Sequence, residues 1–167
     1  MMNLDSPKLQ PPSPALLAAL LDVLGAKGFT TDPDVMQPWL TDWRGKYHGH
    51  AAAMLSPATT DEVAAVVKLA SDAGVALVPQ GGNSGMVGGA TPDTSGTAIV
   101  LSLRRMAAIR QVDAEAGQTV CEAGVVLQTL HDAAEAAGMR FPLTLGGRGS
   151  ATIGGLIATN AGGTQVL

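Results

Sequence analysis

The amino-acid sequence predicts an α+β fold, because helical and extended patterns alternate along its 167 residues. Apolar residues recur at helical spacing over 16–24, 63–70 and 126–134, and such stripes are typical of amphipathic helices. Short apolar runs bounded by turn residues predict buried strands between these helices. Glycine is also concentrated in two clusters, which predicts two loops with unusual backbone conformations.

The first helix is expected to begin at residue 14, after a polar, proline-bearing leader at 1–13. Ser13 is a suitable N-cap, and Pro14 fits the first helical position. The glycines that follow predict that this helix ends near Gly25 or Gly28.

The next segment, 31–50, has an irregular pattern. Trp39 and Trp43 are four residues apart and could share a helix face, and the simplest interpretation is two core tryptophans. His48 and His50 would point to the same side of a strand, but no third ligand lies nearby in the sequence, so no metal site is predicted.

A strand–helix–strand unit is predicted over 51–79. Its helix starts after Thr59, which forms a capping-box pattern with Glu62, and it ends at Gly74. Such a unit usually yields a parallel pair of strands. The second strand, 75–78, leads directly into the first glycine cluster.

Three further strands and one helix are expected downstream. Strands at 109–112 and 119–122 flank a turn, and a strand at 97–101 precedes them. Cys121 is interpreted as a small packed side chain. The helix beginning near Val126 ends at Gly138 and places His131 on a solvated face.

The first cluster carries five glycines between residues 81 and 89, and no residue from 75 to 92 is charged. Successive backbone N–H groups in such a loop can form a nest for an anion, so a phosphate or pyrophosphate site is predicted. A glycine-rich turn at a sheet edge is the alternative. The loop matches neither the G-x-x-x-x-G-K-[ST] nor the G-x-G-x-x-G pattern, and Met86 breaks a G-x-S-x-G match.

The second cluster spans 146–163, and Arg148 is its only charged residue. Together the two clusters hold 12 of the 21 glycines, which turns alone do not explain. Two such loops suggest one long ligand that is contacted from two sides. Hydrogen-bonding groups suited to ribityl hydroxyls or a heterocycle edge come from four side chains. These are Ser150, Thr152, Thr159 and Asn160.

Composition excludes several function classes. A net charge of −4 argues against a nucleic-acid surface, and no apolar run approaches the roughly 20 residues of a membrane-spanning helix. No basic region precedes an apolar one at the N-terminus, and the single cysteine suits a reducing compartment, so a cytoplasmic location is expected. Only 14% of the residues are charged, which suggests that ligand, partner or further chain covers some surface.

Two motifs carry a resemblance to a known family. Residues 79–89, Pro-Gln-Gly-Gly-Asn-Ser-Gly-Met-Val-Gly-Gly, resemble the pyrophosphate loop of the vanillyl-alcohol-oxidase-type FAD domain, also called PCMH-type. Residues 153–163 resemble its second flavin-binding segment. The loop form, the segment 143–149 and the pair Asp42-Trp43 resemble the branch of D-2-hydroxyglutarate and D-lactate dehydrogenases, on the D-2-hydroxyglutarate side.

The resemblance implies a two-lobed FAD-binding domain with the flavin between the lobes and the second lobe incomplete. A helix and irregular leader would occupy 1–50. The first lobe would span 51–104, with the pyrophosphate loop at 79–90. The second would start in 105–167, with its flavin-binding segment at 142–163.

The resemblance also assigns cofactor contacts. The pyrophosphate loop would contribute Pro79, Gly81, Gly82, Asn83, Ser84, Gly85, Gly88 and Gly89. The ribityl chain and isoalloxazine would be approached by Pro142, Leu143, Gly146, Ser150, Thr152, Ile153, Gly154, Gly155, Thr159 and Asn160. Some relatives attach flavin covalently through a loop histidine, and Asn83-Ser84 stands there instead, so non-covalent FAD is predicted.

The implied function is that of the N-terminal FAD-binding portion of a dehydrogenase that oxidises a D-2-hydroxy acid to the 2-oxo acid. The catalytic base, the substrate-binding residues and any metal-binding histidines would lie beyond residue 167, so no catalytic or metal residue is expected in this chain. A quinone or an electron-transfer flavoprotein would accept the electrons, and a homodimer is one possible assembly.

Two alternatives stay open. The chain could belong to another PCMH-type enzyme, such as the flavin subunit of a molybdenum hydroxylase or a reductase of cell-wall sugar precursors. It could also be a catalytically inactive fragment.

Overall fold

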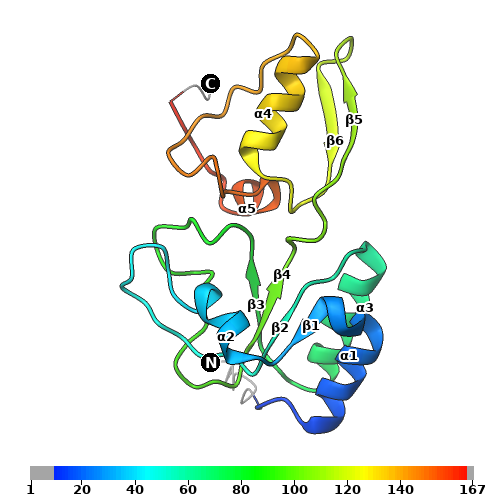
Figure 1. Cartoon of the computed structure of the whole chain (residues 1–167), viewed down its shortest axis with the longest axis vertical. Coiled ribbons are helices and arrows are strands. Elements are labelled where there is room, and N and C mark those ends of the chain that lie inside the picture. Colours follow the sequence, from blue (N-terminus) through cyan, green and yellow to red (C-terminus); the bar gives the residue numbers. More distant parts are fainter. Residues whose placement is uncertain (1–9, 165–167) are drawn as a thin grey trace, which may run out of the picture.

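The computed structural model describes residues 10–164, so most of the leader and the last three residues lie outside the described part. The chain forms two lobes that meet at a narrow waist (Figure 1). The first lobe contains a four-stranded sheet, and the second contains a two-stranded hairpin packed beside helices.

The first sheet has the strand order β1-β2-β4-β3. Its strands are β1 (Phe29–Thr30), β2 (Ala53–Leu55), β3 (Leu77–Gln80) and β4 (Ile99–Ser102). The strands β2 and β3 both pair in parallel with β4, whereas β1 is antiparallel to β2. The two strands of the predicted strand–helix–strand unit are therefore parallel, but β4 lies between them. All four residues of β4 are buried, which explains its central place.

The caps predicted for two helices are confirmed. In α1 (Pro14–Gly28), the Ser13 side chain accepts a hydrogen bond from the backbone N–H of Leu16. In α3 (Thr60–Asp72), Thr59 accepts from the backbone N–H of Glu62 at 3.1 Å, and the Glu62 carboxylate accepts from the Ala58 N–H at 2.7 Å rather than from Thr59 as a capping box would have it. Gly25 and Gly74 adopt positive φ angles of 63° and 64°, which explains the kink near the end of α1 and the stop after α3.

The core of the first lobe lies between the sheet and the pair α1 and α3. Leu20 of α1 and Val66 of α3 are fully buried and pack with Leu55 and Ile99. The predicted leader over 1–50 therefore contains elements of the first lobe itself, because α1 and β1 contribute to the same core and sheet as β2. A helix with a continuous apolar stripe needs a surface to bury it, and this sheet provides one.

The other face of the sheet is covered by α2 (Pro33–Met36) and the 3-10 helix η1 (Gln37–Trp39). Met36 packs against Met54 and Val100, and Trp39 lies beside them, with the Arg104 guanidinium 5.2 Å from its ring centre. The prediction of two core tryptophans is wrong for Trp43, whose surface is 58% exposed. The helical region ends at Trp39, so the two indoles do not share a helix face.

The second lobe consists of a β-hairpin and two helices. Antiparallel strands β5 (Ile109–Asp113) and β6 (Gln118–Cys121) pack beside α4 (Leu127–Ala136) and α5 (Ile153–Ala158). Cys121 packs against this lobe's core. The prediction that the second glycine cluster is a loop throughout is wrong, because α5 lies inside it.

Two local contacts explain why the structure differs from the sequence predictions in the second lobe. Gly154 lies so close to Ala123 that an added Cβ would sit 2.7 Å from the Ala123 methyl carbon, so glycine allows α5 to pack tightly. His131 is half-buried and its Nε2 donates to the Leu143 carbonyl at 2.8 Å, which corrects the expected solvated position.

Among residues 10–164, no helix combines the length and apolarity needed to cross a membrane.

The packing of α1 generates a test of its place in the first lobe. We expect Leu20→Ala to lower the free energy of unfolding by about 2–5 kcal/mol, because it leaves a cavity in a fully buried site. The neighbouring Leu21→Ala, at a position 40% exposed, should change it by less than about 0.5 kcal/mol. Urea unfolding of both variants checks this. Equal, small effects would contradict a structural role for α1.

Candidate functional site

The glycine loop, defined as residues 81–90, follows β3 at the carboxyl end of the parallel strands. Ligands of open α/β sheets commonly bind at this edge. None of the loop's backbone N–H groups donates a hydrogen bond to another group in the described part of the chain. The loop therefore presents a row of available donors without any charged side chain, as an anion-binding nest requires.

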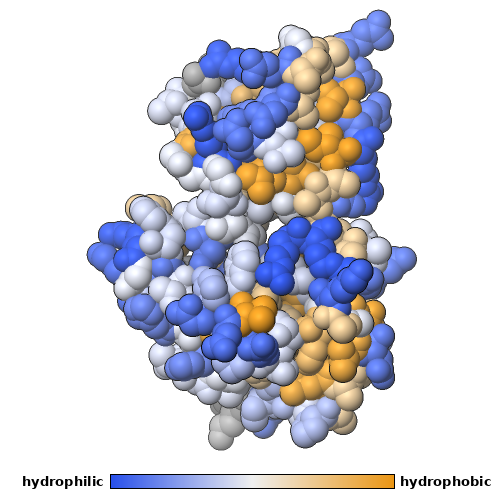
Figure 2. All heavy atoms as spheres, in the orientation of Figure 1, coloured by the Kyte–Doolittle hydropathy of each residue, from blue (hydrophilic) through white to orange (hydrophobic). Residues whose placement is uncertain are grey.

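The second segment, defined as residues 142–163, meets the glycine loop across the waist between the lobes. An added Cβ on Gly81 would overlap the Thr152 side chain, and one on Gly82 would overlap the Ser150 carbonyl. At Gly147 an added Cβ would lie 3.3 Å from the Ser84 Cβ. The two glycine clusters are thus brought face to face. The waist is coloured mostly by residues of intermediate hydropathy in Figure 2, as small residues produce.

Different physical reasons explain why Gly82, Gly88 and Asn83 suit their positions in the loop. Gly82 does not have a positive φ, so it is required by the approach of the Ser150 backbone. Gly88 has a φ of 72°, and its Cα lies against the Tyr47 ring. Asn83 has a φ of 49°, a left-handed conformation that asparagine tolerates better than most residues.

The remaining residues predicted to contact the cofactor lie in several different surroundings. Leu143, Ile153 and Asn160 line a cavity of about 750 Å³ in the second lobe, between the hairpin, α4 and α5. The Thr159 hydroxyl, just after α5, donates to the Gly155 carbonyl of that helix at 2.8 Å. Five other predicted residues are exposed. These are Pro79, Gly85, Gly89, Pro142 and Gly146.

A smaller cavity of about 520 Å³ adjoins the glycine loop itself. Gly82 and Asn83 form one wall, and Trp39, Asp42 and Trp43 form part of the other. Although the cavity in the second lobe is larger, no residue of the glycine loop lines it. We therefore assign the candidate site to the contact between the lobes, where the available N–H donors lie.

Sequence reasoning used Asp42 only for the family resemblance and did not predict that Asp42 and Trp43 line this cavity. Asp42 is buried, and its carboxylate accepts backbone N–H groups from Tyr47 at 2.6 Å, Lys46 at 2.7 Å and Arg44 at 3.3 Å. The Tyr47 N–H is the main cause of a lowered Asp42 pKa, which the Lys46 and Arg44 donors reinforce against the effect of burial. Asp42 with Gly45 three residues later, at a φ of 64°, is a turn pattern that could have shown it.

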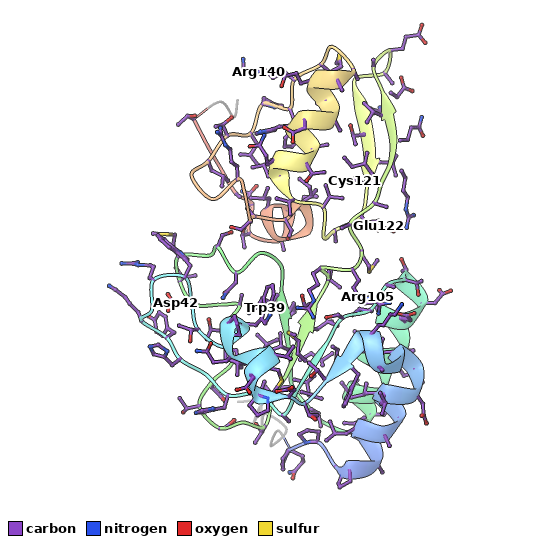
Figure 3. All side chains as sticks on the ribbon, viewed as in Figure 1. Trp39, Asp42, Arg105, Cys121, Glu122 and Arg140 are labelled. Atoms are coloured by element: carbon purple, nitrogen blue, oxygen red, sulfur yellow. The ribbon has the colours of Figure 1, made fainter. Side chains whose placement is uncertain are left out.

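The other reactive side chains are held by their local surroundings, and of these His48 lines the cavity of about 520 Å³ beside the glycine loop. Burial raises the pKa of the Cys121 thiol, so this residue is a poor nucleophile near neutral pH. Figure 3 shows Cys121 in the second lobe and Asp42 and Trp39 in the first. His48 hydrogen-bonds to Thr41 Oγ1 and the Gly45 carbonyl. Within residues 10–164, no group of three or more histidine, cysteine or acidic side chains could hold a metal ion.

Comparison with known proteins identifies what the arrangement is similar to. The model of the FAD binding domain family matches residues 51–167. The D-2-hydroxyglutarate dehydrogenase of Bos taurus is 42% identical over 90% of this chain and 27% of its own length. The Arabidopsis thaliana enzyme of the same name is 37% identical over 87% and 26%. A D-2-hydroxyglutarate–pyruvate transhydrogenase of Saccharomyces cerevisiae is 38% identical over 81% and 27%.

Solved structures share the fold. An alkyldihydroxyacetonephosphate synthase superposes with a TM-score of 0.79 at 21% identity, over 93% of this chain and 33% of that one. A p-cresol methylhydroxylase gives 0.71 at 20% identity, over 87% and 28%. These likenesses confirm the predicted α+β fold of the PCMH type. The chain spans only about a quarter of the length of the curated relatives it matches.

The residues present fit an FAD cofactor. The glycine loop offers unpartnered backbone N–H groups to a pyrophosphate and has no acidic side chain that would repel it. Atoms of the second lobe occupy the positions that side chains would take at Gly81 and Gly82. The absence of these side chains lets the two backbones approach one ligand together.

The lowered pKa of Asp42 leads to a prediction about pH. Its ordinary value is 3.8, so the carboxylate stabilises the fold above that pH, and this contribution is lost as the pH falls through the lower folded-state pKa. We expect Asp42→Asn to be less stable than the wild type at neutral pH, with the difference shrinking in acid. Urea unfolding followed by tryptophan emission measures this.

The matched control for Asp42 is Asp72→Asn, which removes an exposed ion pair with Lys68 on α3. Exposed pairs contribute little, so its stability should stay close to that of the wild type across the same pH range. A difference between wild type and Asp42→Asn that stays constant as the pH falls would contradict the role of the charged carboxylate.

Proposed function

This chain belongs to the FAD-binding domain family, and on that basis we propose that it is the FAD-binding portion of a dehydrogenase that oxidises a D-2-hydroxy acid to a 2-oxo acid. Relatives named D-2-hydroxyglutarate dehydrogenase support the 2-hydroxyglutarate class of substrate. The printed sequence matches only part of these relatives, so the activity is proposed for a whole enzyme that includes this chain.

The observation that carries the proposal is the meeting of the glycine loop and the second segment at the waist. In this proposal, the backbone N–H groups of 81–84 hold the pyrophosphate, while Gly88 and Gly89 shape the loop. The second segment approaches the ribityl chain and the isoalloxazine. The loop has no histidine, which supports non-covalent binding.

The side chains present indicate which step of the proposed reaction this chain serves. When bound, FAD supplies the two-electron acceptor for oxidation of the substrate carbon. None of the contacts described between Gly82 and Ser150 or between Gly81 and Thr152 involves a carboxylate or an imidazole. We propose that this chain binds and orients the cofactor, and that a base elsewhere in the whole enzyme takes the hydroxyl proton.

The other partners follow from the same resemblance. A quinone or an electron-transfer flavoprotein is the proposed electron acceptor, and a homodimer is a proposed assembly. The single cysteine supports a reducing compartment such as the cytoplasm, whereas the names of the bovine and Arabidopsis relatives place those proteins in mitochondria.

Flavin retention tests the binding half of the proposal. We expect the purified chain, mixed with FAD and desalted, to keep a visible flavin band that acid releases. Gly82→Val should lose that band, because its side chain would overlap the Ser150 carbonyl. Gly149→Val is the matched control, since no atom lies within 4 Å of an added Cβ there. Full flavin retention by Gly82→Val would show that the cofactor is not held where Gly82 meets Ser150.

A chimaera tests the catalytic half. We expect the isolated chain to show no turnover, but to restore D-2-hydroxyglutarate oxidation when it replaces the matched segment of the bovine enzyme. Dye reduction with D-2-hydroxyglutarate measures this, and the same chimaera carrying Gly82→Val is the negative control. A chimaera that holds FAD but does not oxidise the substrate would count against the proposed role of this chain.

A further inference from the structure

The glycine loop is held by one buried side chain that belongs to neither predicted set of cofactor contacts. Gln80 is the last residue of β3 and is only 2% exposed. Its Nε2 donates to the Trp39 carbonyl at 2.9 Å and to the Ala90 carbonyl at 2.7 Å. Both amide hydrogens therefore bind backbone, and Ala90 is the final residue of the loop.

These two hydrogen bonds close the loop at its ends. Gln80 directly precedes the loop, so its bond to Ala90 joins the entry of the loop to its exit. A glycine-rich loop has many alternative conformations, and fixing them costs conformational entropy. A bond that brings the ends together in advance lowers the entropy that a ligand must remove on binding.

The second hydrogen bond attaches the closed loop to a wall. The 39–50 segment, defined by those residue numbers, follows the glycine loop along much of its length. Asn83 Nδ2 donates to the Thr41 carbonyl at 2.7 Å, and the Tyr47 ring lies against Gly88. Just after the loop, the His50 N–H donates to the Asp93 carbonyl at 2.8 Å. Gln80 binds this segment at its first residue, Trp39.

The family match begins at residue 51, so it does not include this wall. Asp42 nevertheless shapes the segment through its three backbone hydrogen bonds, and the cavity of about 520 Å³ lies between the segment and the loop. The conformation of the glycine loop thus depends on residues that precede the matched region.

We propose that Gln80 is a positioning residue for the FAD site, which closes the glycine loop and attaches it to the 39–50 segment. The inference rests on the proposed function, because it takes the loop to be the pyrophosphate site. Gln80 does not itself touch the cofactor in this proposal. Its donors set the conformation in which the loop's N–H groups converge.

The test measures FAD affinity and loop closure separately. Equilibrium dialysis of the 167-residue chain against FAD gives the affinity. Acrylamide quenching of Trp39 in a Trp43→Phe background reports on the wall, because the chain has only two tryptophans and both lie in the 39–50 segment. Thermal unfolding of each variant is recorded alongside, so that lost stability is distinguished from lost positioning.

Gln80→Met removes both donors and keeps the side-chain length. We expect it to weaken FAD binding roughly ten- to thirtyfold, since two hydrogen bonds of ordinary strength are lost, and to make Trp39 more accessible to acrylamide. Gln80→Asn is the milder variant, because its amide is too short to reach both carbonyls. It should change both measurements in the same direction.

Two control variants show how much FAD affinity changes when a buried residue next to Gln80, or a glutamine elsewhere, is replaced. Ser102→Ala alters the buried residue paired with Gln80 across the sheet, whose hydroxyl has no hydrogen-bond partner in the described part of the chain. Gln128→Met makes the same chemical change on exposed α4, where Gln128 Nε2 donates to Asp132. Both should keep FAD affinity within about twofold of the wild type.

The outcomes separate this inference from the proposed function. Unchanged FAD affinity and Trp39 quenching in both Gln80 variants would overturn the inference, and so would an equal loss in Ser102→Ala. If the wild type itself binds no FAD, the proposed cofactor site fails. Quenching of Trp39 then decides alone whether Gln80 closes the loop, and unchanged quenching in Gln80→Met would overturn that closure.

Discussion

The close approach of two glycine-bearing backbones at the waist is the constraint on which the site depends. Gly81 and Gly82 reach the second lobe at Thr152 and Ser150 because neither has a side chain. Each lobe has its own hydrophobic core, one between α1, α3 and the sheet and the other around Leu127. The site is therefore created by the contact between two separately packed bodies, and its shape is set by backbone atoms.

A site built from backbone N–H groups gains donors without charge, but its flexible loop must be restrained. The glycine loop gains hydrogen-bond donors without charged side chains, so it can lie in a region with little charge. Its flexibility must be restrained from outside, because glycine itself favours no single conformation. The restraint in this fold comes from the 39–50 segment, from the turn around Asp42 and from the buried amide of Gln80.

The physical character of the site agrees with the proposed division of work in the whole enzyme. A family that binds FAD needs a rigid cradle for a long anionic ligand, and this chain provides backbone donors and packed lobes. Of the acidic groups with lowered pKa values, Glu122 accepts from the Ala108 N–H and from Arg110. The other two, Asp42 and Asp93, accept hydrogen bonds from local N–H or hydroxyl groups in turns. Their role in the fold is to hold turns, and the proposed proton transfer belongs to other parts of the enzyme.

The sequence by itself determined the features that depend on local hydrogen bonds and spacing. Ser13 and Thr59 mark helix starts because their side chains bond within three residues, and the glycine clusters predicted a candidate site because their composition is unusual. Family membership followed from the same two motifs, and the family match bears it out.

Only the tertiary structure decided how distant segments meet. It placed β4 between β2 and β3, joined α1 to the first lobe, and left Trp43 exposed. Gln80 escaped sequence reasoning because its partners are 41 and 10 residues away. Contacts at such separations depend on packing and the entropy of loop closure rather than on local periodicity, so a single sequence contains no pattern that marks them.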